Sequence, residues 1–129
     1  MAGRGGVVGW GRTLAGRRPR GRVPALAYRS RFADARLDRL FAGVLSLRTP
    51  EECYRFFEDL CTIGELQALA QRLQVAELLR AGATYEDISA RTGMSSATIS
   101  RIKRYLVYGA DGYRLVLDRL AQAPGEPQP

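Results

Sequence analysis

Side chains suited to contacting a polyanion are concentrated in one short stretch in the second half of the chain. The candidate DNA-binding residues are Ser95, Ser96, Ala97, Thr98, Ser100, Arg101, Lys103 and Arg104. At about 100° per residue, a helix with Ile99 and Ile102 inward places small, hydroxyl and basic side chains on its opposite face. Hydroxyl groups bond phosphates or base edges, and arginine bonds guanine O6 and N7 together. The stretch therefore predicts a surface that enters the major groove of duplex DNA.

A helix-turn-helix is predicted around this stretch, over residues 84–106. Its first short helix covers about residues 85–92, with Ile88 facing inward. Gly93 stands where the chain turns sharply, since glycine tolerates a positive φ. Ser95 is a suitable N-cap for the second helix. The alternative is that the same unit packs against helices or binds a protein, with its basic face solvated.

Four further helices are predicted from apolar periodicity and from residues typical of helix ends. The first covers about residues 34–47, and the second starts at Pro50 and carries Cys53, Phe56, Phe57 and Leu60. The third covers about residues 63–81, and Asp111 caps the last. Two starts carry the spacing of a capping box, Thr49 with Glu52 and Thr62 with Glu65. Because no segment alternates apolar and polar residues as a strand does, we expect an all-α protein of six helices.

The helix predicted over residues 63–81 is apolar on more than one face. Leu66, Leu69 and Leu73 form one stripe, while Leu78 and Leu79 add apolar surface around the rest. Such a helix must be covered on more than one side, and a small chain has few elements to do so. We therefore expect a homodimer with interdigitated helices. The alternative is that the first two helices and the last cover it within one chain.

The formal net charge of +7 is unevenly distributed. Nine arginines and one aspartate give residues 1–36 a charge of +8, while eleven basic and twelve acidic residues give the remainder −1. We expect a disordered basic arm over residues 1–32, a folded domain over 33–121 and a flexible tail over 122–129. The arm is a solvated tail, a source of further DNA contacts, or translated upstream sequence.

Composition argues against an enzyme. The chain has no histidine and two cysteines, Cys53 and Cys61, which lie too far apart along one helix for a disulfide and are expected to be buried. We therefore expect no metal site and no cofactor. The glycine-rich start lacks the strand and helix that frame a phosphate-binding loop. No apolar run reaches the roughly 18 residues of a membrane helix, so we expect a cytoplasmic protein.

Two segments are similar to those of a known family: LQALAQRLQVAELLRAG at residues 66–82 and TISR at residues 98–101. Through them, residues 37–120 resemble the Trp-repressor-like family, in its small and poorly characterised bacterial branch. The resemblance implies a six-helix fold with a helix-turn-helix and an intertwined homodimer. It also implies regulation of transcription through two half-sites about one turn of DNA apart.

The resemblance also implies a candidate ligand cleft. Arg72 and Arg101 fall where the family's repressor binds tryptophan between two arginines. Ile102 and Tyr105 stand where the repressor has glycine and serine, and their larger side chains argue against tryptophan as the effector. Otherwise Arg72 forms an ordinary ion pair, and Arg101 contacts DNA directly.

Three hypotheses follow from these observations. The leading one is a homodimeric transcriptional regulator, a repressor by family, that binds double-stranded DNA sequence-specifically. The second is a metabolite-responsive repressor with a small-molecule effector. The third is a protein-interaction adaptor of the transcription machinery, whose basic face meets an acidic protein surface.

Overall fold

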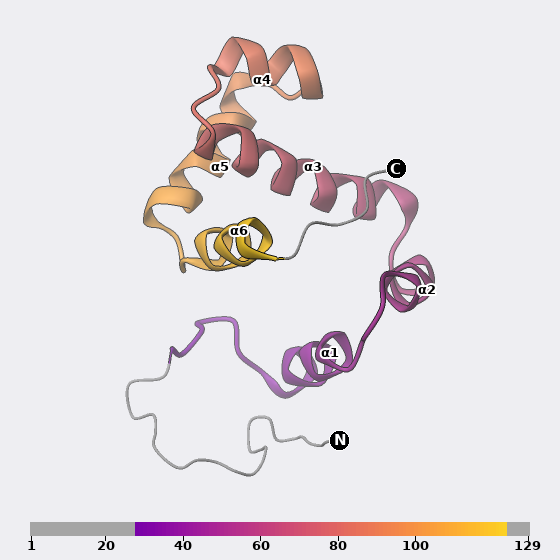
Figure 1. Cartoon of the computed structure of the whole chain (residues 1–129). Helices are drawn as coiled ribbons and strands as arrows, with labels where there is room; N and C mark the ends of the chain where they lie inside the picture. The colour runs from indigo at the N-terminus through magenta and orange to yellow at the C-terminus, as the bar shows by residue number, and fades with distance from the viewer. Residues whose placement is uncertain (1–27, 124–129) are drawn as a thin grey trace. The chain divides into compact units, whose positions relative to one another are not determined.

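The computed structural model describes residues 28–123, which contain six α-helices and no β-strand (Figure 1). The helices are α1 (Ala35–Leu45), α2 (Pro50–Leu60), α3 (Ile63–Arg80), α4 (Tyr85–Thr92), α5 (Ser96–Tyr108) and α6 (Gly112–Gln122). The predicted all-α fold is thereby confirmed. The chain divides into two compact units, the first ending at Leu60 with α1 and α2, the second containing α3–α6. The predicted arm and tail lie outside the described residues, apart from residues 28–32 and 122–123.

Local hydrogen bonds explain where the helices begin. At α3, the Thr62 hydroxyl accepts from the Glu65 N–H at 3.1 Å, and the Glu65 carboxylate accepts from the Thr62 N–H at 2.8 Å. This is the predicted capping box, which satisfies two otherwise unpaired amides. At α2, Thr49 accepts from the Glu52 N–H, but the Glu52 carboxylate accepts from the N–H of Arg48 instead of Thr49. In the second capping box, the reciprocal hydrogen bond of the glutamate is therefore made to the residue before the threonine.

The turn between α5 and α6 differs from the prediction. Asp111 precedes α6 with a left-handed backbone (φ 66°), and its side chain makes no capping hydrogen bond. N-caps usually have an extended backbone that aims the side chain at the helix amides. The Asp111 carboxylate instead lies 3.2 Å from the Arg114 guanidinium, which also donates to the Val107 carbonyl. The prediction that Asp111 caps α6 is wrong, and Asp111 and Arg114 together tie α6 to the end of α5.

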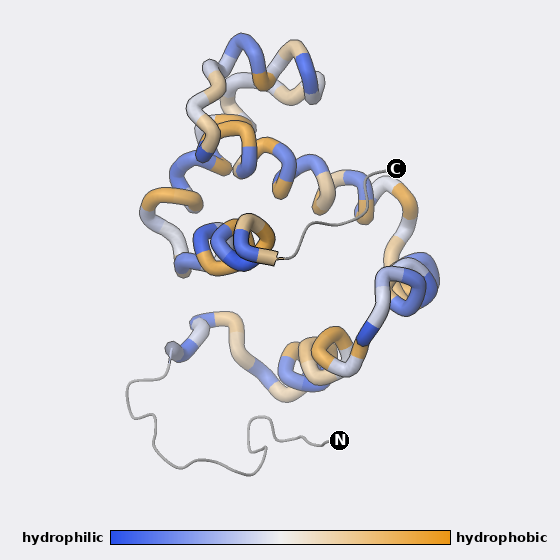
Figure 2. The backbone as a smooth tube through the Cα atoms, viewed as in Figure 1, coloured by the Kyte–Doolittle hydropathy of each residue, from blue (hydrophilic) through white to orange (hydrophobic). Residues whose placement is uncertain are grey.

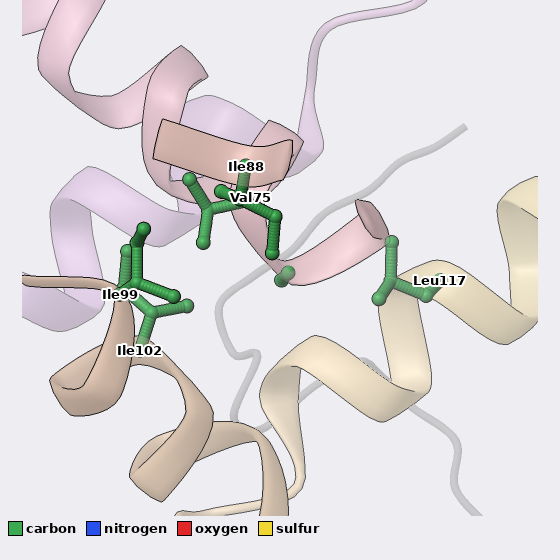
Figure 3. Close-up of a cluster of buried hydrophobic side chains, with 6 residues drawn as sticks. Val75, Ile88, Ile99, Ile102 and Leu117 are labelled. Atoms are coloured by element: carbon green, nitrogen blue, oxygen red, sulfur yellow. The ribbon is translucent and has the colours of Figure 1, made fainter. Parts of the chain in front are cut away.

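One hydrophobic core joins the four helices of the second unit (Figure 3). Its buried members are Val75, Ala76, Ile88, Ile99, Ile102 and Leu117. They come from α3, α4, α5 and α6, and Ile99 and Ile102 point toward Val75 and Ile88. Burying a side chain of this size stabilises the fold by about 1.5–3 kcal/mol. The core therefore fixes α5 against α3 and α4.

The second unit does not cover the beginning of α3. Ile63 is 71% exposed and Leu69 is 47% exposed, whereas Val75 and Ala76 further along the helix are fully buried. Apolar and polar residues intermingle along α3 in Figure 2. Helix α3 therefore carries exposed apolar side chains outside the surface that packs against α4, α5 and α6.

The first unit has no buried residue in either of its helices. Phe56 and Phe57 of α2 meet edge to face, with ring centroids 5.4 Å apart. Gly43 of α1 packs close to Phe56, since a Cβ built on that glycine would lie 3.9 Å from the ring. Phe41 and Leu45, one turn apart on α1, remain exposed. The helices α1 and α2 thus carry apolar side chains that their own unit leaves uncovered.

The cysteines also differ from expectation. Cys53 is exposed on α2 and Cys61 is half-buried just before α3, and both are free thiols. The prediction that both are buried is wrong, because α2 contributes no side chain to a closed core. Among residues 28–123, no cluster of three or more His, Cys, Asp or Glu side chains is arranged to hold a metal ion.

Candidate nucleic-acid interface

The turn between α4 and α5 is made by Gly93. Its φ of 75° places it in the left-handed region, and its N–H donates to the Ser89 carbonyl at 2.8 Å to close α4. A Cβ at this position would meet no atom within 4 Å, so the backbone conformation and not lack of space favours glycine. The Thr92 hydroxyl donates to the Ile88 carbonyl and accepts from the Met94 N–H, which stiffens the turn. The predicted helix-turn-helix is therefore present.

Three isoleucines hold the two helices of this motif together. Ile88 of α4 and Ile99 of α5 are fully buried, and Ile102 is 4% exposed. Because Ile99 and Ile102 occupy one face of α5, the opposite face is left to solvent. The inward residues predicted from the sequence are confirmed.

The outward face of α5 carries six of the eight predicted DNA-binding residues. The exposed members are Ser96, Ala97, Ser100, Arg101, Lys103 and Arg104. Helix α5 has no acidic side chain anywhere along its length. The structure thus gathers small, hydroxyl-bearing and cationic side chains on one surface, and their contact with DNA stays a prediction.

The two arginines of this surface have no acidic partner in the described chain, unlike several other arginines. Within residues 28–123, neither Arg101 nor Arg104 forms an ion pair or hydrogen bond, and Lys103 lies 5.9 Å from the Tyr85 ring centroid. By contrast Arg80 of α3 pairs with Asp118 of α6, and four further described arginines pair with an aspartate or glutamate two to four residues away. The guanidinium groups of α5 therefore keep all of their donors available to a ligand.

The other two predicted residues, Ser95 and Thr98, start the helix. The Ser95 hydroxyl accepts from the Thr98 N–H at 3.2 Å and lies 3.1 Å from the Thr98 hydroxyl. This satisfies the predicted capping role of Ser95. Thr98 is half-buried. These two hydroxyls are therefore engaged with each other, while those of Ser96 and Ser100 have no such partner in the described chain.

Of the two arginines in the candidate ligand cleft, Arg72 influences a tyrosine of α6 that the sequence did not single out. Burial raises the pKa of Tyr113 on α6, and the nearby charge of Arg72 opposes that rise. Arg72 is exposed and forms no ion pair in the described chain. Ile102 belongs to the core and Tyr105 is 52% exposed. The structure thus places the charge of Arg72 close enough to Tyr113 to lower the pKa of that tyrosine.

The fold and this surface define an all-α protein with a helix-turn-helix. A family model described as Trp repressor protein matches residues 35–121, and the chain belongs to that family. The chain is 59% identical over 90 residues to the uncharacterised protein YerC of Bacillus subtilis (strain 168), covering 70% of this chain and 86% of that protein.

Two solved structures share the fold at 49% sequence identity. One is a TrpR-like protein from Eubacterium eligens, with a TM-score of 0.65 and coverage of 70% of this chain and 93% of that one. The other, from Staphylococcus aureus, has a TM-score of 0.66 and coverage of 72% and 93%. The family is one of helix-turn-helix DNA-binding regulators. Separately, no helix within residues 28–123 is long and apolar enough to cross a membrane.

Proposed function

We propose that the protein is a sequence-specific DNA-binding transcriptional regulator that acts as a homodimer. The observation that carries this proposal is the outward face of α5, where Arg101 and Arg104 stand exposed without an acidic partner. The buried isoleucines and the Gly93 turn hold that face rigidly, as a helix in the major groove requires.

Electrostatics favour a nucleic acid over an acidic protein surface for this face. The small Ser96 and Ala97 at the start of α5 allow the backbone to come close to the bases, while Arg101 and Lys103 supply charge. A helix whose first turn is small and whose next turns are basic suits a groove lined by phosphates. A protein-interaction adaptor would not require small residues in the first turn of the helix followed by basic residues in the next turns.

The homodimer accounts for the apolar surface that each unit leaves open. Phe41 and Leu45 of α1, with Ile63 and Leu69 of α3, are exposed in the single chain. Side chains of this size cluster at interfaces that remove them from water. Two copies would place two α5 helices on one duplex, and a palindromic operator with half-sites about one helical turn apart follows.

The test is selection of bound fragments from random duplex DNA, followed by mobility shifts with variants. Arg101→Ala and Arg104→Ala are each expected to weaken binding by roughly 1–3 kcal/mol. Arg119→Ala removes an exposed arginine of α6 and serves as the matched control for lost charge. If Arg101→Ala and Arg104→Ala bind the selected DNA as tightly as the Arg119 variant, α5 is not the DNA-binding surface.

A further inference from the structure

The outward face of α5 has a restricted chemistry for reading bases. No Asn, Gln, Asp or Glu occurs between Ser96 and Tyr108. Asparagine and glutamine are the side chains that bond adenine through two hydrogen bonds, and carboxylates accept from the cytosine amino group. Helix α5 therefore lacks the usual means of recognising adenine or cytosine in the major groove.

The groups that remain recognise guanine and thymine. Arginine bonds guanine O6 and N7 together, and a methyl group packs against the thymine C5-methyl. Serine hydroxyls both donate and accept, so Ser96 and Ser100 bond different bases or phosphates with little preference. Discrimination by α5 thus depends on its arginines and on the exposed methyl group of Ala97.

We propose that α5 recognises one guanine through Arg101 and one thymine methyl group through Ala97 in each half-site. This inference rests on the proposed DNA-binding function and adds the bases that the site selects. Ala97 and Arg101 are four residues apart, so they lie on the same face of the helix, separated by about 6 Å of rise. Both are exposed, so one half-site accommodates both contacts.

Arg101 suits the base-reading role better than the other two cations of α5. Recognition helices contact base edges mainly through their N-terminal residues, and Arg101 lies in the second turn while Arg104 lies in the third. Lys103 sits over the Tyr85 ring and offers a point charge without the paired donors of a guanidinium. We assign Arg104 and Lys103 to phosphates, where charge matters more than geometry.

The test uses the full-length protein and the duplex it selects, modified one base type at a time in both half-sites. Replacing guanine by 7-deazaguanine removes only the N7 acceptor, and replacing thymine by deoxyuracil removes only the methyl group. At one guanine position the wild-type protein is expected to lose binding by about 5- to 150-fold. At one thymine position the expected loss is about fourfold, as for one buried methyl group.

Matched variants assign each loss to a side chain. In Arg101→Ala the 7-deazaguanine duplex is expected to bind as well as the unmodified one, because the contact is already absent. Arg104→Ala retains the sensitivity to 7-deazaguanine but depends less steeply on salt, by about one phosphate contact. Ala97→Gly loses the sensitivity to deoxyuracil, and Ala97→Ser provides a second variant with better helix propensity.

Two results would overturn the inference while leaving the proposed function intact. One is sequence-specific binding that no 7-deazaguanine substitution weakens, and the other is a guanine sensitivity that persists in Arg101→Ala. Selection that enriches no sequence at all contradicts the proposed function itself. The two failures are therefore distinguishable in the same series of measurements.

Discussion

The two units of the chain differ in how far their apolar side chains are buried. Among residues 28–123, the six fully or nearly buried hydrophobic residues lie in α3–α6, and none lies in α1 or α2. The α3–α6 unit therefore has an internal core that orients the outward face of α5. The α1–α2 unit has amphipathic helices without a core of its own. In the function proposed above, the geometry of DNA contact would come from the α3–α6 unit, and the α1–α2 unit would contribute to the dimer.

The largest expected effect comes from the core of the second unit. Ile88→Ala removes a fully buried side chain, so the free energy of unfolding is expected to fall by about 2–5 kcal/mol. Urea denaturation followed by circular dichroism measures this loss. Leu45→Ala removes a 69% exposed side chain of the first unit and is the comparison at equal protein concentration. Similar losses for the two variants at high dilution would contradict the contrast between the units.

The association role of the first unit predicts a second, somewhat smaller effect. Replacing Phe41 and Leu45 together by serine is expected to weaken the proposed dimer by about 3 kcal/mol, because both side chains then lose apolar contact area. Sedimentation equilibrium measures the dissociation constant. Arg39→Ser changes a polar residue exposed on the same helix and controls for unfolding of α1. An unchanged dissociation constant would place the interface elsewhere.

The Gly93 turn gives a further prediction about stability within the second unit. Gly93→Ala is expected to lower the free energy of unfolding by about 1–2 kcal/mol, because a side chain is strained at φ 75° although no atom obstructs it. Thermal unfolding measures the change. Gly64→Ala, in the first turn of α3, is the control, since that glycine has no positive φ and an added Cβ meets no neighbour. A Gly93 variant as stable as the Gly64 variant would show that the turn adapts.

For Asp111 we expect the free energy of unfolding to change in the opposite direction. Asp111→Gly is expected to raise the free energy of unfolding by up to about 1 kcal/mol, because glycine adopts φ 66° without strain. The lost ion pair with Arg114 offsets part of this gain, since both side chains are more than half exposed. Denaturant titration of Asp111→Gly beside Asp111→Asn separates the backbone from the charge. A loss of stability in both variants would mean that the ion pair outweighs the strain.

The smallest effect concerns pH. Burial raises the pKa of Tyr113 above the ordinary value of 10.0, so the unfolded chain gives up this proton at a lower pH than the folded one. The free energy of unfolding is therefore expected to fall as pH rises beyond 10. Tyr113→Phe should remove this part of the decrease, as measured by urea titrations at several alkaline pH values. An identical pH profile in the variant would mean that Tyr113 titrates alike in both states.

Local rules predicted the helix-turn-helix well. Gly93 and Ser95 act through contacts within a few residues, which is why their turn and cap could be read from the sequence. Asp111 was misjudged because aspartate is common both as an N-cap and in left-handed turns, and residue type does not choose between the two backbones. Cys53 was misjudged because periodicity identifies a helix face without telling whether anything covers it.

The sequence by itself determined the six helices, the glycine turn and which residues lie on the outward face of α5. These features depend on neighbours one or two turns away. Only the tertiary structure decided which arginines are engaged. Arg80 meets Asp118 across 38 positions of chain, while Arg101 meets no acidic group among residues 28–123. The physical reason is that charge pairing and burial depend on distances in space, which packing of α3 against α6 sets and local propensity does not.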